Sequence, residues 1–256
     1  MNHLSENTAC GLSPFPRAWQ ICSASCLRLL AIVLMLLDHL WATVIPGNMW
    51  MTFVGRLAFP IFAFQLVEGV LHTSNLPRYR RRLLLFALLS EVPFNLVMGG
   101  GPIFPFHQNV IFTLLLGFVV ICALEDLRHG RGKPLRALLT FLGCSLLSIF
   151  GFVDYGFYGF LTILLFYLFR GFPLAWLCQL AGMVFIHGFL FEGMSIPVTI
   201  FGLSRMISNQ SFAVFSLLPI WMYNGQKGQH SRLLQYGSYL FYPAHLLLLY
   251  LISALA

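Results

Sequence analysis

Residues 26–41 read CLRLLAIVLMLLDHLW, and this stretch decides how the whole chain is interpreted. Every residue between Arg28 and Asp38 is apolar, without the alternation of polar and apolar positions that marks a strand. Because about 20 such residues cross a bilayer as a helix, the run 27–45 predicts a transmembrane helix. Ionisable residues at that depth cost at least ~2.5 kcal/mol on insertion scales, so Asp38 and His39 are candidates for function.

The composition extends this interpretation to the rest of the chain. Hydrophobic residues make up 59% of the 256 positions and charged residues 9%, with a mean hydropathy of +0.82, which excludes an ordinary soluble domain. We expect an all-α fold, a polytopic transmembrane helical bundle of nine or ten spans, with one domain at 27–256 after a cytoplasmic N-terminal segment at 1–26. The expected helices are 27–45, 53–71, 82–98, 108–126, 135–150, 156–170, 173–191, a Pro-broken region at 196–223 that crosses once or twice, and 236–254.

The basic residues lie in short segments between the apolar runs. The net charge is +7, but anionic lipid headgroups and membrane topology explain these segments better than nucleic acid does. Because the basic clusters occupy alternate loops, we expect a multi-pass protein of the cell (inner) membrane with its N-terminus in the cytoplasm. The clusters are Arg78, Arg80, Arg81 and Arg82, then Arg128, Arg131, Lys133 and Arg136, and the turns without Lys or Arg are 46–52, 99–107, 151–155 and 191–195.

The first helix carries the sharpest catalytic candidate. Arg28 and His39 are eleven residues apart, which returns to within about 20° of the same helix face, roughly 16 Å further along the axis. With Arg28 at the headgroups, His39 lies near mid-membrane, where an imidazole can act as general base towards a hydroxyl or amine. Asp38 points about 100° away, so it either takes part in catalysis or pairs with a residue such as Arg56.

Other polar residues within the apolar runs fall on shared helix faces. Gln65, Glu68 and His72 follow at i, i+3 and i+7, beyond a kink expected at Pro60. Asn109 lies where a helix starts, so it is either a cap or a site residue. Further candidates are Glu91 and Asn95, one turn apart, and Tyr242 and His245 in the last helix, where an interfacial tyrosine belt is the alternative for Tyr242.

The four arginines between residues 78 and 82 have two interpretations. They either signal topology or clamp the phosphates of a nucleotide-bearing donor that arrives from the cytosol. No Walker, dinucleotide-fold, His-Glu-x-x-His or nucleophile-elbow pattern occurs in the chain. The six cysteines show neither a metal-ligand pattern nor a disulfide framework, so we expect no metal.

Five segments resemble the TraX family of membrane acyltransferases, whose best-known members acetylate the N-terminus of conjugative pilin subunits. They are IVLMLLDH at 32–39, GRLAFPIFAF at 55–64, QNVIF at 108–112, DYGFYG at 154–159 and FYPAHL at 241–246, in the family's order. The spacing of Arg28 and His39 also resembles the first helix of acyltransferase-3-type membrane enzymes. The resemblance implies that His39 is the catalytic base and that Arg28 lies near an acyl-CoA donor, with supporting roles for Asp38, Arg56, Asn109, Tyr155 and His245.

The leading hypothesis is therefore a membrane acyltransferase. It would move an acetyl group from acetyl-CoA, a substrate rather than a tightly bound cofactor, to an acceptor that is a protein N-terminus, a lipid or a glycan. The expected site comprises catalytic His39 and Asp38, donor-binding Arg28, Arg78, Arg80, Arg81 and Arg82, and supporting Arg56, Gln65, Glu68, Glu91, Asn95, Asn109, Tyr155, Tyr242 and His245. The alternatives are a proton-coupled transporter, with a relay through Glu68, Glu91, His39 and His245, and an assembly scaffold of a secretion system.

Overall fold

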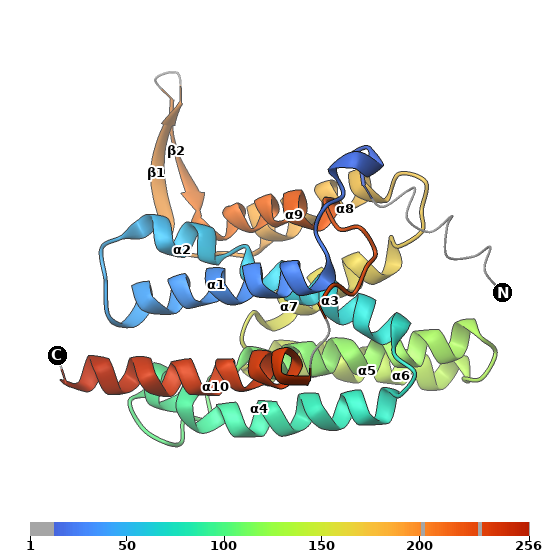
Figure 1. Cartoon of the computed structure of the whole chain (residues 1–256), viewed down its shortest axis with the longest axis horizontal. Helices are drawn as coiled ribbons and strands as arrows, with labels where there is room; N and C mark the ends of the chain where they lie inside the picture. Colours follow the sequence, from blue (N-terminus) through green and yellow to red (C-terminus); the bar gives the residue numbers. More distant parts are fainter. Residues whose placement is uncertain (1–12, 201–202, 230–231, 256) are drawn as a thin grey trace. The chain divides into compact units, whose positions relative to one another are not determined.

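The computed structural model describes residues 13–200, 203–229 and 232–255, and it is mainly helical (Figure 1). Five helices are long and apolar enough to cross a membrane, and three shorter apolar helices accompany them among the described residues. The helical membrane fold is confirmed, whereas the number of nine or ten spans stays a prediction. The five are α1 (Ala24–Thr43), α2 with α3 (Met49–Gly55 and Ala58–His72), α4 (Leu76–Gly99), α5 (Val110–Arg128) and the Tyr236–Leu255 part of α10 (Arg232–Leu255).

The remaining elements are shorter. They are η1 (Arg17–Trp19), α6 (Pro134–Phe150), α7 (Gly156–Leu168), α8 (Ala175–Met183), η2 (Val184–Leu190), β1 (Ser195–Ile200), β2 (Leu203–Ser208), η3 (Asn209–Ser216) and α9 (Leu217–Trp221). The expected helix at 173–191 is thus α8 continued by η2, a π-helix in which the hydrogen bonds skip one more residue than in an α-helix.

Side-chain caps explain why two helices start where they do. The Ser23 hydroxyl accepts a hydrogen bond from the Cys26 amide at the start of α1. The side-chain oxygen of Asn75 accepts one from the Arg78 amide at the start of α4. With Pro77 in its first turn, α4 begins six residues before the expected position 82. The four arginines therefore lie on a helix and not in a loop, which corrects the expected placement.

A break separates α2 from α3 at Arg56 and Leu57. The expected single helix at 53–71 carried its kink at Pro60. Proline has no amide hydrogen and its ring clashes with the carbonyl four residues earlier, which is that of Arg56. The break therefore lies one turn before the proline that causes it.

The segment 196–223 is not the broken transmembrane helix that the sequence led us to expect. Its first part is an antiparallel hairpin, in which β1 pairs with β2 in the register Ser195↔Ser208 to Ile200↔Leu203. Four of the six β1 residues are β-branched, and Pro197 cannot donate a helical hydrogen bond, so an extended backbone is favoured. The hairpin is followed by the short helices η3 and α9, of 8 and 5 residues. The expectation of a broken transmembrane helix over 196–223 is therefore wrong.

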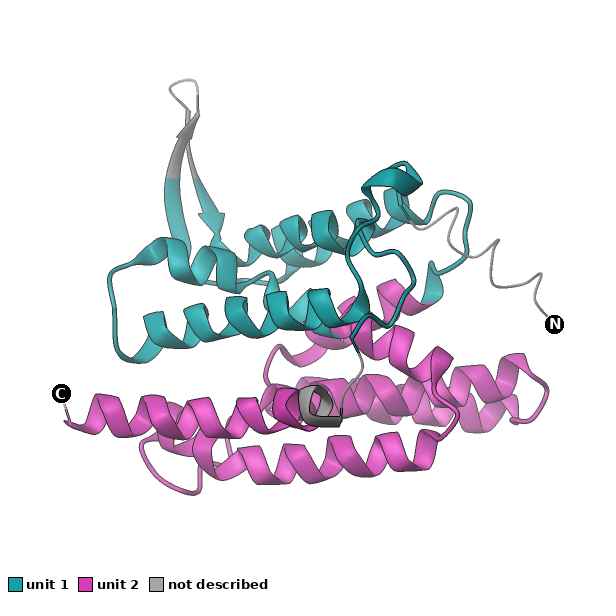
Figure 2. Ribbon diagram, viewed as in Figure 1, with its two compact units in different colours: residues 1–62, 168–231 teal, residues 63–167, 232–256 magenta. Residues whose placement is uncertain are grey.

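The chain divides into two compact units, which are described separately (Figure 2). Unit 1 comprises residues 1–62 and 168–231, and unit 2 comprises residues 63–167 and 232–256. In unit 1, α1 packs on α2, and the backbone of Cys22 bridges to that of Tyr223. In unit 2, α4 packs on α5 and α10, and α5 packs on α6. Part of the unit 2 core is a cluster of buried Val120, Cys144, Phe160 and Leu164.

Candidate functional site

Unit 1 contains a closed ion pair between α1 and the end of α2. A guanidinium nitrogen of Arg56 lies 2.9 Å from Asp38 Oδ1, and the two side chains are 18% and 16% exposed. The same nitrogen donates to the hydroxyl of buried Thr52 at 3.0 Å. The approach is close because residue 55 is glycine, since a Cβ there would overlap the side chain of Asp38. Of the two roles that the sequence left open for Asp38, pairing with Arg56 is the one observed.

His39 follows Asp38 on α1 and is half-buried. Its backbone carbonyl accepts the hydroxyl of Thr43 at 2.6 Å, within the helix itself. Arg28 lies on the same helix and is also half-buried. Because both residues lie in the continuous helix α1, their expected shared face and roughly 16 Å separation follow from helical geometry. Their roles as base and donor contact stay predictions.

In unit 2, Asn109 joins the start of α5 to α4. Its side-chain oxygen accepts the Ile111 amide at 3.1 Å, and its side-chain nitrogen donates to Glu91 Oε2 at 2.6 Å and to the Ala87 carbonyl at 2.8 Å. The residue is fully buried. Asn109 is therefore a helix cap that also binds the Glu91 carboxylate, and its role as a site residue stays a prediction.

Two of the segments that carried the family resemblance pair with one another in unit 2. The Gln108 amide donates to the Phe152 carbonyl at 2.7 Å, and the Asp154 amide donates to the Gln108 carbonyl at 2.8 Å. The hydroxyl of Thr113 donates to the Asp154 carbonyl. Tyr155 follows in the left-handed region, with φ of 60°. Such backbone strain in a non-glycine residue is often found at functional sites.

His107 contacts the acidic residue of this pair of segments. His107 Nε2 lies 3.4 Å from Asp154 Oδ1, and its ring lies edge-on to Phe94 with centroids 5.1 Å apart. The hydrogen bond to Asp154 raises the pKa of His107 above its usual 6.5, with support from the charges of Asp154 and Glu91, while burial acts in the opposite direction. His107 directly precedes the segment QNVIF and Asp154 begins the segment DYGFYG, but neither was among the expected site residues. Their positions near Asn109 and Tyr155 in the sequence could have identified them as candidates.

The last helix completes this group. Tyr242 is buried and interacts electrostatically with Asp154, Glu91 and Tyr155. His245, one turn further on and 5% exposed, donates from Nδ1 to the Phe241 carbonyl at 2.8 Å. We call the following set the carboxylate cluster: Glu91, His107, Asn109, Asp154, Tyr155 and Tyr242. Within the described part of the chain, neither carboxylate of this cluster pairs with a lysine or arginine.

Other expected site residues of unit 2 lie in separate contacts. His72 Nδ1 lies 3.6 Å from Glu68 Oε2 and donates to the Glu68 carbonyl, while Gln65 is half-buried on the same helix. Buried Asn95 donates to the Pro102 carbonyl at 3.3 Å.

The four arginines of α4 have different surroundings. Arg78 and Arg81 are exposed, and Arg80 lines a pocket described below. The guanidinium of Arg82 lies over the rings of Tyr79 and Tyr239, at 5.5 and 5.6 Å from their centroids. The expected joint role in donor binding stays a prediction.

Among the described residues, the cysteine thiols and the possible metal ligands do not form a further candidate site. No group of three or more His, Cys, Asp or Glu side chains there could hold a metal. The five described cysteines are free, and Cys10 lies outside the described residues. Burial, and then the neighbouring Cys26, raises the pKa of Cys22 to about 11, so this thiol stays protonated at neutral pH.

Comparisons with known proteins agree with the resemblance of the five segments. A probable fimbrial assembly protein, FimC of serogroup H1 from Dichelobacter nodosus, is 28% identical over 246 residues, covering 89% of this chain and 94% of the relative. No solved structure matches the chain. A family model described as TraX protein matches residues 23–253, a range that includes His39 and all of the carboxylate cluster. This chain belongs to the TraX family.

Proposed function

We propose that this chain is a membrane acetyltransferase that transfers an acetyl group from acetyl-CoA to the N-terminal amine of a pilus subunit. Membership of the TraX family supports the reaction class, and the relative named as a fimbrial assembly protein supports a pilus-related acceptor. We also propose that the N-terminus and the basic clusters face the cytoplasm, so that the donor enters from the cytosol.

The observation that carries the choice of an amine is the charge of the carboxylate cluster. Glu91 and Asp154 both act electrostatically on Tyr242 and on His107, and neither pairs with a lysine or arginine among the described residues. An amine is positively charged at neutral pH, whereas a hydroxyl is neutral. Two such carboxylates beside Tyr242 therefore attract an ammonium group in preference to a neutral alcohol or sugar.

The proposed chemistry needs no covalent intermediate. The acceptor ammonium first loses one proton to solvent. The neutral nitrogen then attacks the thioester, the new carbon–nitrogen bond forms as the carbon–sulfur bond breaks, and His39 takes the proton from nitrogen and gives it to the leaving thiolate. Arg28 would hold the donor, and hydroxyl or amide donors of the site would stabilise the oxyanion.

The first test is transfer of label from radiolabelled acetyl-CoA in membranes that contain equal amounts of wild type, His39→Ala or His129→Ala. His129 is an exposed histidine at the end of α5, outside every group described above, so it is the matched control. We expect His39→Ala to lower the rate by about 100-fold or more and His129→Ala to leave it unchanged. Equal rates for all three proteins would refute the role of His39.

The acceptor class requires a separate measurement. Label on a protein N-terminus is the expected result, whereas label on lipid or glycan would refute the amine assignment. We also expect Glu91→Gln to raise KM for an amine acceptor about tenfold, equivalent to ~1.4 kcal/mol, with little change in kcat. Glu192→Gln, at an exposed residue of unit 1, is the charge-matched control. Wild-type membranes that label nothing would favour the transporter or scaffold hypothesis.

A further inference from the structure

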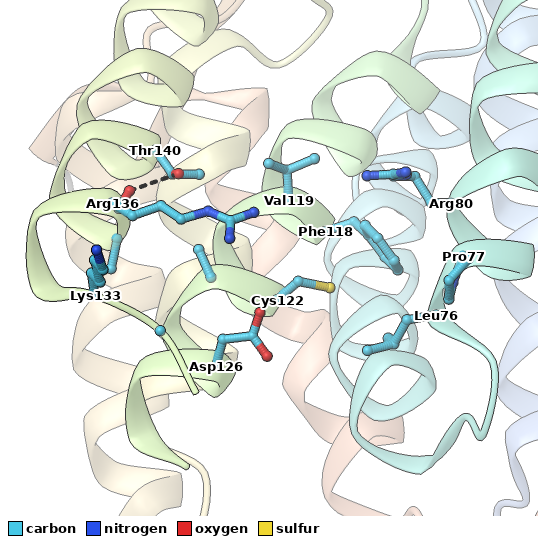
Figure 3. A pocket seen from close by; sticks show the side chains of 13 residues that line it. Leu76, Pro77, Arg80, Phe118, Val119, Cys122, Asp126, Lys133, Arg136 and Thr140 are labelled. Atoms are coloured by element: carbon cyan, nitrogen blue, oxygen red, sulfur yellow. Dashed lines mark hydrogen bonds between the residues drawn. The ribbon is translucent and has the colours of Figure 1, made fainter. Parts of the chain in front are cut away.

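A pocket of about 330 Å³ lies among α4, α5 and α6 of unit 2 (Figure 3). The α5 helix forms its floor, the first turns of α4 form one wall, and the start of α6 with the preceding loop forms the other. The lining residues that matter for its chemistry are Arg80 from α4, Phe118, Val119 and Asp126 from α5, and Lys133 and Arg136 from the loop and α6. None of them belongs to the carboxylate cluster.

The charges of this pocket are unbalanced. Arg80 points into the pocket from one wall and Arg136 from the other, where Lys133 also lines it. Within the described residues, none of the three forms an ion pair with a carboxylate. The fourth charged residue, Asp126, is held by Arg131, whose Nε lies 3.3 Å from Asp126 Oδ1. The three cations that line this pocket outnumber its one carboxylate, which favours an anionic ligand, and arginine is well suited to phosphate.

The floor of the pocket adds an apolar requirement. Asp126 lies near the charged end of α5, and Phe118 lies eight residues earlier, about 12 Å along the helix axis. Between them the lining is Val119, Cys122 and Ala123. Since α5 is long and apolar enough to cross a membrane, a bilayer around it would place the Asp126 end of the pocket at the charged boundary and the Phe118 end in the apolar layer. A ligand with a phosphate at one end and a hydrocarbon chain at the other fits both parts.

We propose that this pocket binds an anionic phospholipid. Arg80, Lys133 and Arg136 hold the headgroup phosphate, and an acyl chain lies along Val119 and Phe118. The three cations accordingly do more than orient the protein in the membrane. A CoA donor also carries phosphates, but the volume is at the lower end for ligand pockets, which favours a headgroup over a nucleotide thioester.

Native mass spectrometry of the full chain in detergent, titrated with phosphatidylglycerol, phosphatidylcholine or CoA, tests this assignment. The pocket variant is Arg80→Gln/Lys133→Gln/Arg136→Gln. The control variant is Arg17→Gln/Arg128→Gln/Lys227→Gln, which removes the same charge from exposed residues outside the pocket and outside every expected site.

We expect phosphatidylglycerol to bind the wild type and the control variant alike, and the pocket variant at least tenfold more weakly. Phosphatidylcholine should bind weakly to all three proteins, and CoA should not displace phosphatidylglycerol. Equal phosphatidylglycerol binding by the pocket and control variants would overturn the proposal. So would loss of CoA binding alone in the pocket variant, because the pocket would then be a nucleotide-phosphate site. Neither result depends on acetyl transfer, so the outcome is separate from that of the proposed function.

Discussion

The two units hold their carboxylates in opposite ways. In unit 1, Asp38 is neutralised by Arg56 at 2.9 Å, with Thr52 as a further hydrogen-bond partner of the guanidinium. In unit 2, Glu91 and Asp154 are held by an amide and an imidazole, without a lysine or arginine partner among the described residues. A closed ion pair fixes helices and has little left to offer a ligand. A cluster with uncompensated negative charge remains able to bind a cation.

The largest effect tests whether the ion pair of unit 1 is structural. Arg56→Gln leaves a mostly buried carboxylate without its guanidinium, and we expect a loss of about 3 kcal/mol in unfolding free energy. Thermal unfolding of the detergent-solubilised protein measures it. Asp38→Asn/Arg56→Gln removes both charges and should recover at least half of the loss. A double variant as unstable as the sum of its single variants would show that the two side chains act independently.

The next effect tests the scaffold of the carboxylate cluster. Asn109→Ala removes a helix cap and two side-chain donations, one of them to a carboxylate, so we expect a loss of about 2 kcal/mol. Gln108→Ala, whose side chain donates only to the Pro105 carbonyl, should change stability by less than about 0.5 kcal/mol. Thermal unfolding distinguishes them. Equal effects at the two neighbouring positions would mean that the cluster does not depend on Asn109.

A smaller effect probes why α1 and α2 approach so closely. A Cβ at Gly55 overlaps Asp38, so Gly55→Ala should cost about 1.5 kcal/mol by separating the helices and lengthening the ion pair. Gly143 in α6 has no atom within 4 Å of an added Cβ, so Gly143→Ala should stabilise its helix by about 0.5 kcal/mol. In the same unfolding assay, we expect Gly55→Ala to lower the unfolding free energy and Gly143→Ala to raise it. A stabilising Gly55→Ala would refute the close-packing account.

The smallest effect depends on pH. Because the pKa of His107 is raised in the folded protein, its contribution to stability is fully present below about 6.5 and is lost as pH rises through the raised value. At a partly exposed site this contribution should stay below about 1 kcal/mol. The unfolding temperatures of wild type and His107→Gln should therefore converge as pH increases. In an Asp154→Asn background the difference should vary less with pH, and an undiminished variation would show that Asp154 is not the main partner.

Much of the fold could be predicted from the sequence because long apolar runs in a bilayer allow few alternatives to helices. The run at 27–45 became α1 with its ends shifted by a few residues, and the open choice for Asp38 was limited to partners on the next apolar run. A helix cap could also be predicted at Asn109, since this residue directly precedes an apolar run. The hairpin at 195–208 was missed because the hydropathy of its residues suits a membrane helix as well as a strand.

The contacts of the candidate site were less predictable. His107 and Asp154 are 47 residues apart, and the pairing of Gln108 with the loop after α6 brings them together. Likewise, Lys133 and Arg136 indicated only topology in the sequence, and their place in one pocket with Arg80 follows from how α4 and α6 flank α5. Such contacts depend on tertiary packing, which hydrophobic periodicity in a single chain does not encode.

The left-handed backbone of Tyr155 separates two kinds of selection. At φ of 60° a tyrosine carries about 1 kcal/mol of conformational cost that glycine would avoid. A library screened only for heat resistance should therefore enrich glycine at position 155 and lose the phenol beside Tyr242. A library screened for acetyl transfer should retain the aromatic ring. The two screens should thus select different residues at position 155. The residue found there would indicate whether a variant was selected for thermal stability or for activity.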